Sequence, residues 1–414
     1  MKNKFTKLEK SWIFYDVGNS AFVLIISTII PIFFKNLASS DGVALSDSTA
    51  YWSYTLSFAT LVVGILGPTL GRLADGKDKK KKYFTFFLIM GVIGCALLGF
   101  IQTWQLFLLV FLIGRIGFSG SLVFYDAMLV DVTTDENSDE VSSAGYAWGY
   151  IGSVIPFVAC LLIIMNSDKL GLSGSMVGII SFSIIAIWWF VCTIPLLRDY
   201  KQIYYNEEKK GKSFSDIIEG LKETAIKAKE NKPMWMFMLA YFFYIDGVYT
   251  IIELATSYGK DVGIGDTDLL LALLLTQIVA FPFALIFGKL SKKFKTRKLI
   301  EVCVFGYILI VLFALQLDKA WEFWLLAVCV AMFQGGIQAL SRSYFSRLVP
   351  KENSNEFFGI FDIFGKGAAF TGTLLVGVLT QITGHSKIGV AALLILLVVG
   401  LIILIKVPKN SADI

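Results

Sequence analysis

Apolar stretches of about 20 residues recur along the whole chain, and they constrain its fold more than any other feature. A stretch of this length, wound as an α-helix, crosses a hydrocarbon core about 30 Å thick. Hydrophobic residues make up 56% of the 414 residues and charged residues only 17%, whereas a soluble domain of this size needs more polar surface. The sequence therefore predicts an all-α integral membrane protein.

Polar or Gly/Pro breaks divide the apolar sequence into twelve predicted membrane-spanning helices. The longest break follows the sixth span, so we expect an N-terminal half (1–197), a cytoplasmic linker (198–232) and a C-terminal half (233–414). The predicted spans are 12–34, 50–71, 83–101, 104–130, 142–165, 176–197, 233–257, 267–288, 298–316, 321–345, 356–382 and 387–407.

The linker contains the sequence KSFSDIIEGLKETAIKAKE. Ser213 and Asp216 have the spacing of a capping box, and Phe214, Ile217 and Leu221 recur at helical spacing. This pattern predicts an amphipathic helix on the membrane surface. A flexible charged linker is the alternative.

Lys and Arg are distributed unevenly among the loops. With the N-terminus placed inside, the inside segments hold 30 of the 37 Lys and Arg residues and the outside loops hold 5. The positive-inside rule then predicts that both termini are cytoplasmic. The net charge of +5 is thereby explained by topology and by contact with anionic membrane lipids, so no nucleic-acid partner is expected.

The residue types that carry enzymatic or metal chemistry are sparse. The five cysteines fall inside apolar runs, and the single histidine, His385, has no Cys or carboxylate neighbours at metal-ligand spacing. Nucleophile and phosphate-loop motifs are absent from the sequence. We therefore expect no enzymatic activity, no cofactor, no metal and no disulfide framework, and we expect a monomer.

The two halves repeat one another at corresponding positions. The first span contains IFYDVGNSAF around Asp16, and the seventh contains YFFYIDGVYTII around Asp246. Spans two and eight both end in glycine-led basic turns, GRLADGKDKKKK and GKLSKKFKTRK. These repeats predict two pseudo-symmetric six-helix bundles with a solute path between them.

Two levels of family resemblance rest on these motifs. The turn at 71–82 resembles that of the major facilitator superfamily, which implies that Asp75 and the lysines from Lys77 onward latch the cytoplasmic helix ends together. In the second copy, Ser291 and Lys292 follow Leu290 where an acid would stand. A one-sided latch is therefore expected.

The narrower resemblance is to the vacuole-effluxer-like branch, whose bacterial members are called the unknown major facilitator family. It rests on YDVGNSAF, YIDGVYTII and GGIQALSRSYFSRLVPKENSNEFFGIFDIFGKGAAF at 335–370. It implies the major facilitator fold, a bacterial inner membrane, and movement of a small solute such as an amino acid. Relatives usually carry a neutral polar residue where Asp126 stands, so their solute and coupling ion are not transferred to this chain.

Ionisable residues inside the spans are the candidate functional residues. Such a group at the membrane centre costs about 2.5–3.5 kcal/mol, so each needs a partner, water or a function. Arg115 and Asp246 lie near the middle of their spans, and a pair between them is left open. The residues that we expect to contact solute or coupling ion are Asp16, Asn19, Arg115, Asp126, Tyr244, Asp246, Tyr249 and Glu253.

A second group is expected to form a gating charge network, namely Asp75, Arg342, Asp362 and Lys366. Asp362 and Lys366 are four residues apart on one helix and can neutralise each other, with Arg342 as a further partner. Asp126 and Glu253 have the alternative of reaching the headgroup region. Asp16 lies about one turn inside the cytoplasmic face and is therefore a better candidate for a gate than Asp246.

These features predict a secondary active transporter that works by alternating access, coupled to H⁺ or Na⁺. A cation-coupled sugar symporter and a lipid flippase are the alternatives within transport. A non-transporting membrane sensor is a more distant alternative.

Overall fold

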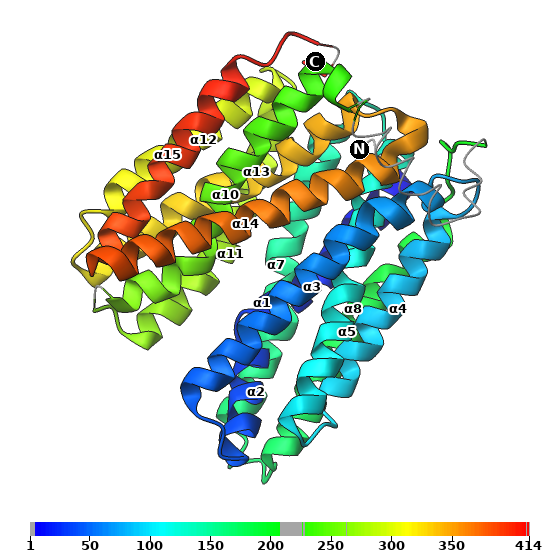
Figure 1. The fold of residues 1–414 in the computed structure, drawn as a ribbon. Coiled ribbons are helices and arrows are strands. Elements are labelled where there is room, and N and C mark those ends of the chain that lie inside the picture. Colours follow the sequence, from blue (N-terminus) through cyan, green and yellow to red (C-terminus); the bar gives the residue numbers. More distant parts are fainter. Residues whose placement is uncertain (1–4, 208–225, 227, 262, 411, 414) are drawn as a thin grey trace.

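The computed structural model describes residues 5–207, 226, 228–261, 263–410 and 412–413, and its regular elements are helices (Figure 1). The predicted amphipathic helix around Ser213 lies outside the described residues. The first bundle consists of α1 (Lys7–Ile26), α2 (Ile29–Ser40), α3 (Leu45–Ala74), α4 (Lys80–Leu98), α5 (Trp104–Ala127), α6 (Leu129–Val132), α7 (Ser138–Met165) and α8 (Gly174–Asp199). The second consists of α10 (Lys232–Asp261), α11 (Asp266–Leu290), α12 (Thr296–Ala314), α13 (Ala320–Leu348), the 3₁₀ turn η1 (Lys351–Asn353), α14 (Ser354–Thr383) and α15 (Ser386–Ile405).

Within the described ranges, 11 helical segments are long and apolar enough to cross a membrane. The remaining predicted span, 298–316, corresponds to α12, which has 19 residues. Its first two turns carry Arg297, Lys298 and Glu301, and the rest of the helix is apolar. The all-α membrane fold predicted from hydropathy is confirmed, with α12 as the twelfth long helical segment.

The predicted span 12–34 falls within one candidate membrane span, Lys7–Ser40, but the helix is interrupted there, because α1 ends at Ile26 and α2 begins at Ile29. The hydroxyls of Ser27 and Thr28 both donate to the Leu24 carbonyl, at 3.2 and 2.6 Å, and so compete with the backbone for that acceptor. Thr28 has φ −128° and ψ −76°, outside the helical region. Pro31 follows in the first turn of α2, where its missing N–H is tolerated.

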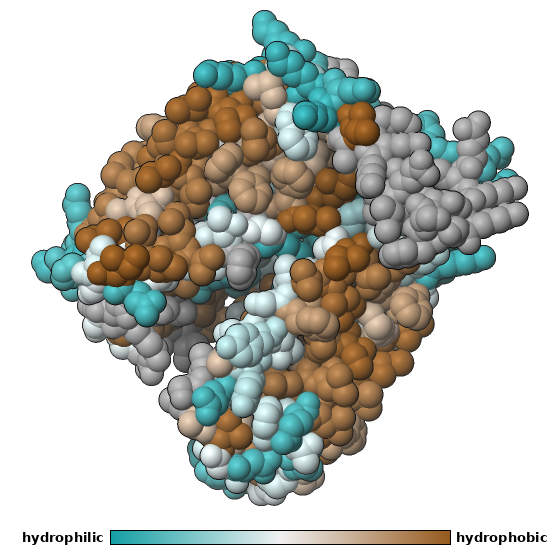
Figure 2. Space-filling model, viewed as in Figure 1, coloured by the Kyte–Doolittle hydropathy of each residue, from teal (hydrophilic) through white to brown (hydrophobic). Residues whose placement is uncertain are grey.

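Each bundle has its own hydrophobic core. One cluster of buried side chains runs from Trp12 to Tyr200, and the other runs from Ala228 to Ala412 with Ala127 of the first bundle added. Apolar side chains also cover the outer surface of the helices, as the brown areas of Figure 2 show, with hydrophilic residues gathered toward the two ends. This arrangement suits a protein that is surrounded by hydrocarbon between its two polar ends.

The two bundles meet at the end of the molecule where α1 begins and α15 ends, which we call the terminal end (Figure 1). They diverge toward the opposite end, and the surface is hollowed between them (Figure 2). Contacts between the bundles are made mainly by α3 with α14 and by α7 with α11 and α13. Within the described ranges, the ion pairs that join the bundles lie at the terminal end.

Glycines allow α3 and α14 to cross closely. A Cβ atom built on Gly359 of α14 would lie 2.5 Å from the Pro68 nitrogen and 2.6 Å from the Gly67 carbonyl carbon of α3. One turn closer to the terminal end, a Cβ atom on Gly71 would lie 2.5 Å from the Asn355 carbonyl oxygen. The neighbouring atoms are backbone, so they cannot move aside as a flexible side chain would.

Gly359→Ala should therefore separate the bundles at the α3–α14 crossing and destabilise the protein by about 1–3 kcal/mol, the usual cost of overpacking. The thermal unfolding midpoint in detergent measures this loss. Gly377→Ala on the same helix is the matched control, because a Cβ atom there meets nothing within 4 Å. Equal midpoints for the two variants would contradict the close-crossing argument.

Candidate functional site at the interface of the two bundles

Arg342 of α13 joins the second bundle to three helices of the first. Its Nη1 donates to Asp126 Oδ1 of α5 at 3.0 Å, and its Nη2 lies 3.4 Å from Asp16 Oδ2 of α1. Its Nε donates to Ser142 Oγ of α7 at 2.9 Å, and Nη2 also donates to the Ser142 carbonyl at 3.1 Å. The guanidinium is thus satisfied by two carboxylates and one serine, all from the other bundle.

Aromatic rings complete the surroundings of Arg342. Its guanidinium carbon lies 4.6 Å from the ring centroid of Trp12 and 4.4 Å from that of Tyr146. Both rings belong to the first bundle, and the negative face of each ring attracts the cation. Arg342 is 4% exposed, so these interactions act away from bulk water, where they are stronger than at a surface.

Sequence reasoning placed Asp16, Asp126 and Arg342 in its candidate groups but did not pair them. The expected contact between Arg342 and Asp362 is replaced by the contacts to the first bundle. Asn19 donates to Asp16 Oδ1 at 3.1 Å and so orients that carboxylate.

A second layer of cross-bundle pairs lies nearer the terminal end and was missed by sequence reasoning. Arg347 Nη1 lies 3.0 Å from Asp139 Oδ1 and donates to Ser138 Oγ at 2.7 Å, while its Nη2 donates to Thr296 Oγ1 at 2.7 Å. The Ser343 hydroxyl donates to the same Asp139 carboxylate. Arg347 and Asp139 were assigned to loops and helix ends because hydropathy excludes such residues from spans.

Two further pairs extend this layer. Lys351 lies 3.0 Å from Asp135, and Lys292 lies 2.5 Å from Glu140. The acidic run TDENSDE at 134–140, which ends in the first turn of α7, thus faces basic residues of the second bundle. This charge complementarity was the one signal in the sequence that could have revealed the layer. Although the second basic turn lacks the expected acid, its Lys292 still reaches the first bundle.

Asp75 caps a helix of the other bundle. Its Oδ1 accepts hydrogen bonds from the backbone N–H of Asn355 at 2.9 Å and from the Asn355 side chain at 2.8 Å. Its Oδ2 accepts from the Glu356 N–H at 3.3 Å. These N–H groups open α14, so the carboxylate satisfies orphan donors and faces the positive end of the helix dipole. Arg72 pairs with Glu356 at 3.1 Å beside it.

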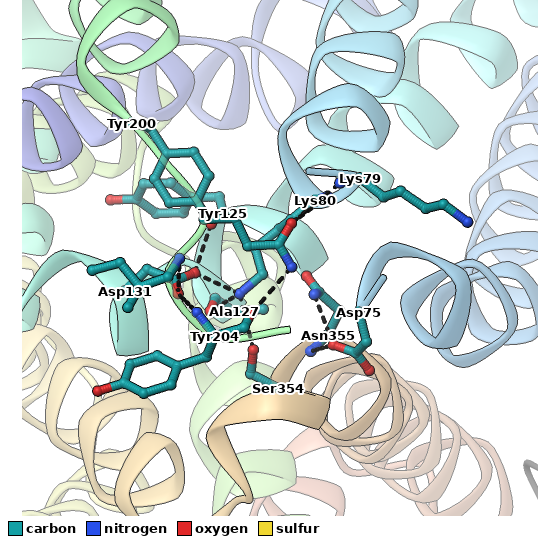
Figure 3. Close-up of polar contacts among 12 residues, drawn as sticks. Asp75, Lys79, Lys80, Tyr125, Ala127, Asp131, Tyr200, Tyr204, Ser354 and Asn355 are labelled. Carbon is teal, nitrogen blue, oxygen red and sulfur yellow. Dashed lines mark hydrogen bonds and ion pairs between the residues drawn. The ribbon is translucent and has the colours of Figure 1, made fainter. Parts of the chain in front are cut away.

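A fully buried ion pair lies next to this cap (Figure 3). Lys80 Nζ lies 2.7 Å from Asp131 Oδ2 and donates to the Ala127 carbonyl at 3.2 Å. It also donates at 3.0 Å to Ser354 Oγ, at the start of α14 in the second bundle. A buried charge is tolerated only with such a set of partners, because its desolvation cost is several kcal/mol.

The Asp131 carboxylate also binds the first residues after α8, Tyr200–Asn206, which we call the strap. Asp131 Oδ1 accepts from the Ile203 and Tyr204 N–H groups at 3.0 and 2.9 Å, and its Oδ2 accepts from the Tyr200 hydroxyl at 2.6 Å. Burial, together with the neighbouring Asp131 charge, raises the pKa of Tyr200 well above its usual value. The neutral phenol is therefore the donor to the carboxylate.

The strap is also bonded to the turn before α4 and to the second bundle. Gln202 Oε1 accepts from the Lys79 and Lys80 N–H groups, both at 3.2 Å. The Asn206 N–H donates to the Asp75 carbonyl at 2.9 Å, and its side chain donates to Asn353 Oδ1 at 3.0 Å. The chain that connects the two bundles is thus fixed to both of them at the terminal end.

The remaining charged candidates lie around the interface of the bundles. Lys366 pairs with Asp362 at 2.6 Å, as the i,i+4 spacing predicted. Arg115 lies 5.5 Å from the centroid of the Phe118 ring and is within electrostatic range of Glu253 and Asp362. Glu253 is exposed. Arg115 belongs to the first bundle, and Glu253 and Asp362 belong to the second.

Asp246 is buried between α10 and α14. Its Oδ1 accepts from the Gly372 N–H at 2.8 Å and from Thr250 Oγ1 at 3.3 Å, whereas no hydrogen-bond partner of Oδ2 is found among the described residues. A Cβ atom on Gly372 would lie 2.2 Å from Asp246 Oδ1, so only glycine permits this approach. In the described part of the chain, no ion pair joins Asp246 to Arg115.

The two tyrosine candidates lie on the same helix. The Tyr244 hydroxyl shares a 2.7 Å hydrogen bond with Ser341 Oγ inside the second bundle, and Tyr244 is fully buried. Tyr249 is half-buried. Tyr249 is therefore better placed than Tyr244 to meet a solute between the bundles.

Comparison with known proteins gives a consistent picture. The sequence profile of the family described as "Vacuole effluxer Atg22 like" matches residues 6–413. The MFS-type transporter YxiO of Bacillus subtilis is 44% identical over 417 residues, covering 100% of this chain and 97% of that protein. Autophagy-related protein 22-1 of Neosartorya fischeri is 25% identical over 304 residues, or 67% of this chain and 49% of that protein.

The fold is similar to that of the human organic anion transporter MFSD10. The TM-score is 0.73 at 12% sequence identity, with 96% of this chain and 98% of that chain covered. At this identity the likeness concerns the fold alone.

Arg342→Gln should open the terminal end, because it leaves the buried Asp16 carboxylate and the partly buried Asp126 carboxylate without their cation. Breaking a buried ion pair typically costs about 3–5 kcal/mol. A shift of that size changes the ratio of closed to open molecules by roughly 100-fold or more. Spin labels at the exposed positions Lys79 and Lys295, on opposite bundles, would report a longer distance.

Arg198→Gln is the control for this measurement, because Arg198 is exposed and pairs with Asp199 in its own bundle. Its distance distribution should equal that of the unsubstituted protein. An unchanged distribution in Arg342→Gln would show that Arg342 does not hold the bundles together.

Proposed function

Because the chain belongs to the Atg22-like vacuole effluxer family and is an MFS-type transporter, we propose that it moves a small solute by alternating access. The observation that carries the proposal is the closure of one end by Arg342, with the surface between the bundles hollowed toward the other end (Figure 2). A transporter of this kind exposes its central site to one side of the membrane at a time.

The proposed orientation follows from the positive-inside rule. The terminal end carries most of the Lys and Arg residues, so it is assigned to the cytoplasm. The closed end is then cytoplasmic and the hollow faces outward. The bacterial cell membrane is the proposed location, and a monomer is sufficient because the path lies within one chain.

Asp246 is the proposed coupling residue. A buried carboxylate with one unsatisfied oxygen and no paired cation in the described residues is costly as an anion, and a proton or a small cation would remove that cost. Protonation would also add a donor at Oδ2. Release of the proton would then accompany a rearrangement of α10 against α14.

The proposed solute carries both charges. Arg115 of the first bundle and Glu253 of the second lie within electrostatic range of each other but are not in direct contact, so a zwitterion placed between them would satisfy both. Amino acids and related metabolites have this chemistry. The family name, vacuole effluxer, supports export as the direction.

The solute can be identified with purified protein. A thermal-shift screen of amino acids, peptides, sugars and nucleosides would reveal a ligand through the stability it adds by mass action. Stabilisation by amino acids would support the zwitterion proposal. Stabilisation by sugars alone would instead favour a sugar symporter.

Asp246→Asn should abolish gradient-driven accumulation of the identified solute in proteoliposomes while solute exchange persists, because Asn keeps the acceptor for the Gly372 N–H but cannot bind a proton. Transport driven by a pH gradient and by a Na⁺ gradient is compared in the same preparation. Asp318→Asn is the control, since Asp318 is exposed and pairs with Lys387. Full accumulation by Asp246→Asn would remove Asp246 from the coupling mechanism.

A further inference from the structure

An open groove of ≈ 860 Å³ lies between the first turns of α4 and the strap. Three lysines line it, Lys81 and Lys82 from α4 and Lys201 from the strap. In the described part of the chain, none of the three lies within ion-pair distance of a carboxylate. Asp78 is the one acid on the groove and is exposed, so the lining carries a net positive charge.

Neighbouring lysines of the same run are used differently. Lys80 is buried against Asp131, and Lys77 lies over the Tyr205 ring at 5.4 Å. The positive-inside rule explains why the run is basic. It does not explain why Lys201, more than a hundred residues away in sequence, converges on Lys81 and Lys82.

The groove changes from basic to apolar along α4. Lys82, Thr85, Phe86 and Ile89 follow one another on a single helical face, at i, i+3, i+4 and i+7. With a rise of about 1.5 Å per residue, Phe86 lies about 6 Å and Ile89 about 10 Å deeper than Lys82. Phe86 is 62% exposed and Ile89 is 42% exposed, so this face offers cations at one level and bare hydrocarbon below it.

We propose that this groove binds an anionic phospholipid, with the headgroup phosphate on Lys81, Lys82 and Lys201 and an acyl chain along Phe86 and Ile89. The combination selects a lipid over a soluble phosphate, because only a lipid satisfies the apolar part. The assignment to the cytoplasmic leaflet rests on the orientation given under the proposed function, but binding itself requires no transport.

The position of the groove gives the lipid a second consequence. One wall is the strap, whose Tyr200 and Asn206 are bonded to Asp131 and Asn353. Asp131 belongs to the first bundle and Asn353 to the second. A headgroup that holds Lys201 therefore restrains the segment that is fixed to both bundles, and it stabilises the closed terminal end.

The test compares two triple variants with the same change in charge. Lys81→Gln/Lys82→Gln/Lys201→Gln removes the groove lysines. Lys289→Gln/Lys293→Gln/Lys295→Gln removes three lysines at the α11–α12 turn on the same end, which are unpaired in the described part of the chain. Native mass spectrometry of each protein with phosphatidylglycerol, cardiolipin or phosphatidylcholine measures lipid retention, and size-exclusion chromatography confirms that each variant is folded.

The groove variant should retain at least about fivefold less phosphatidylglycerol and cardiolipin than the unsubstituted protein. About fivefold is the factor expected from the attraction of one lysine to an anionic headgroup. The control variant should retain as much of these two anionic lipids as the unsubstituted protein. Retention of phosphatidylcholine should be equal in all three proteins. Equal losses in both triple variants would overturn the site in favour of general charge attraction. Displacement of the lipid by inorganic phosphate at millimolar concentration would overturn the lipid assignment.

Discussion

The guanidinium of Arg342 is the interaction on which the arrangement of the two bundles depends. One side chain of α13 reaches carboxylates of α1 and α5 and the backbone of α7, and it lies over the aromatic rings of Trp12 and Tyr146. Arginine suits this position because its planar fork donates in several directions at once and stays charged when buried. A lysine could not contact all three helices simultaneously.

Under the proposed alternating access, the interface at the terminal end has to separate as well as close. Its contacts are ion pairs, helix caps and glycine crossings such as that of Gly359 with Gly67, whereas the apolar packing lies mainly inside each bundle. Buried ion pairs add little net stability, since desolvation offsets most of the attraction, yet they specify one geometry. Water entering an opened interface would solvate the same groups, so two states of similar free energy are feasible.

Hydropathy predicted most helices because each membrane-spanning segment must form its backbone hydrogen bonds within the helix and carry apolar side chains on its surface. Short-range pairs such as Asp362–Lys366 follow from helical spacing alone. The pairing of Arg342 with Asp16 does not, because these residues are 326 positions apart and meet only when the bundles dock. The lysines from Lys77 onward were expected to act as a group, and only the tertiary structure shows which lysine of the run at 79–82 is buried, namely Lys80.

The strap makes the linker part of the interface rather than a passive connection. Asp131 binds the strap through two N–H groups and a phenol, and it binds Lys80, which in turn reaches Ser354 of α14. Separation of α14 from the first bundle would remove the Ser354 oxygen from a buried ammonium, and the remaining partners would have to compensate for it. Under the proposed alternating access, opening of the terminal end would therefore be coupled to release of the strap. A ligand that binds the strap more tightly in the closed state shifts the equilibrium toward that state. The size of the shift is set by the difference between its affinities for the closed and open states.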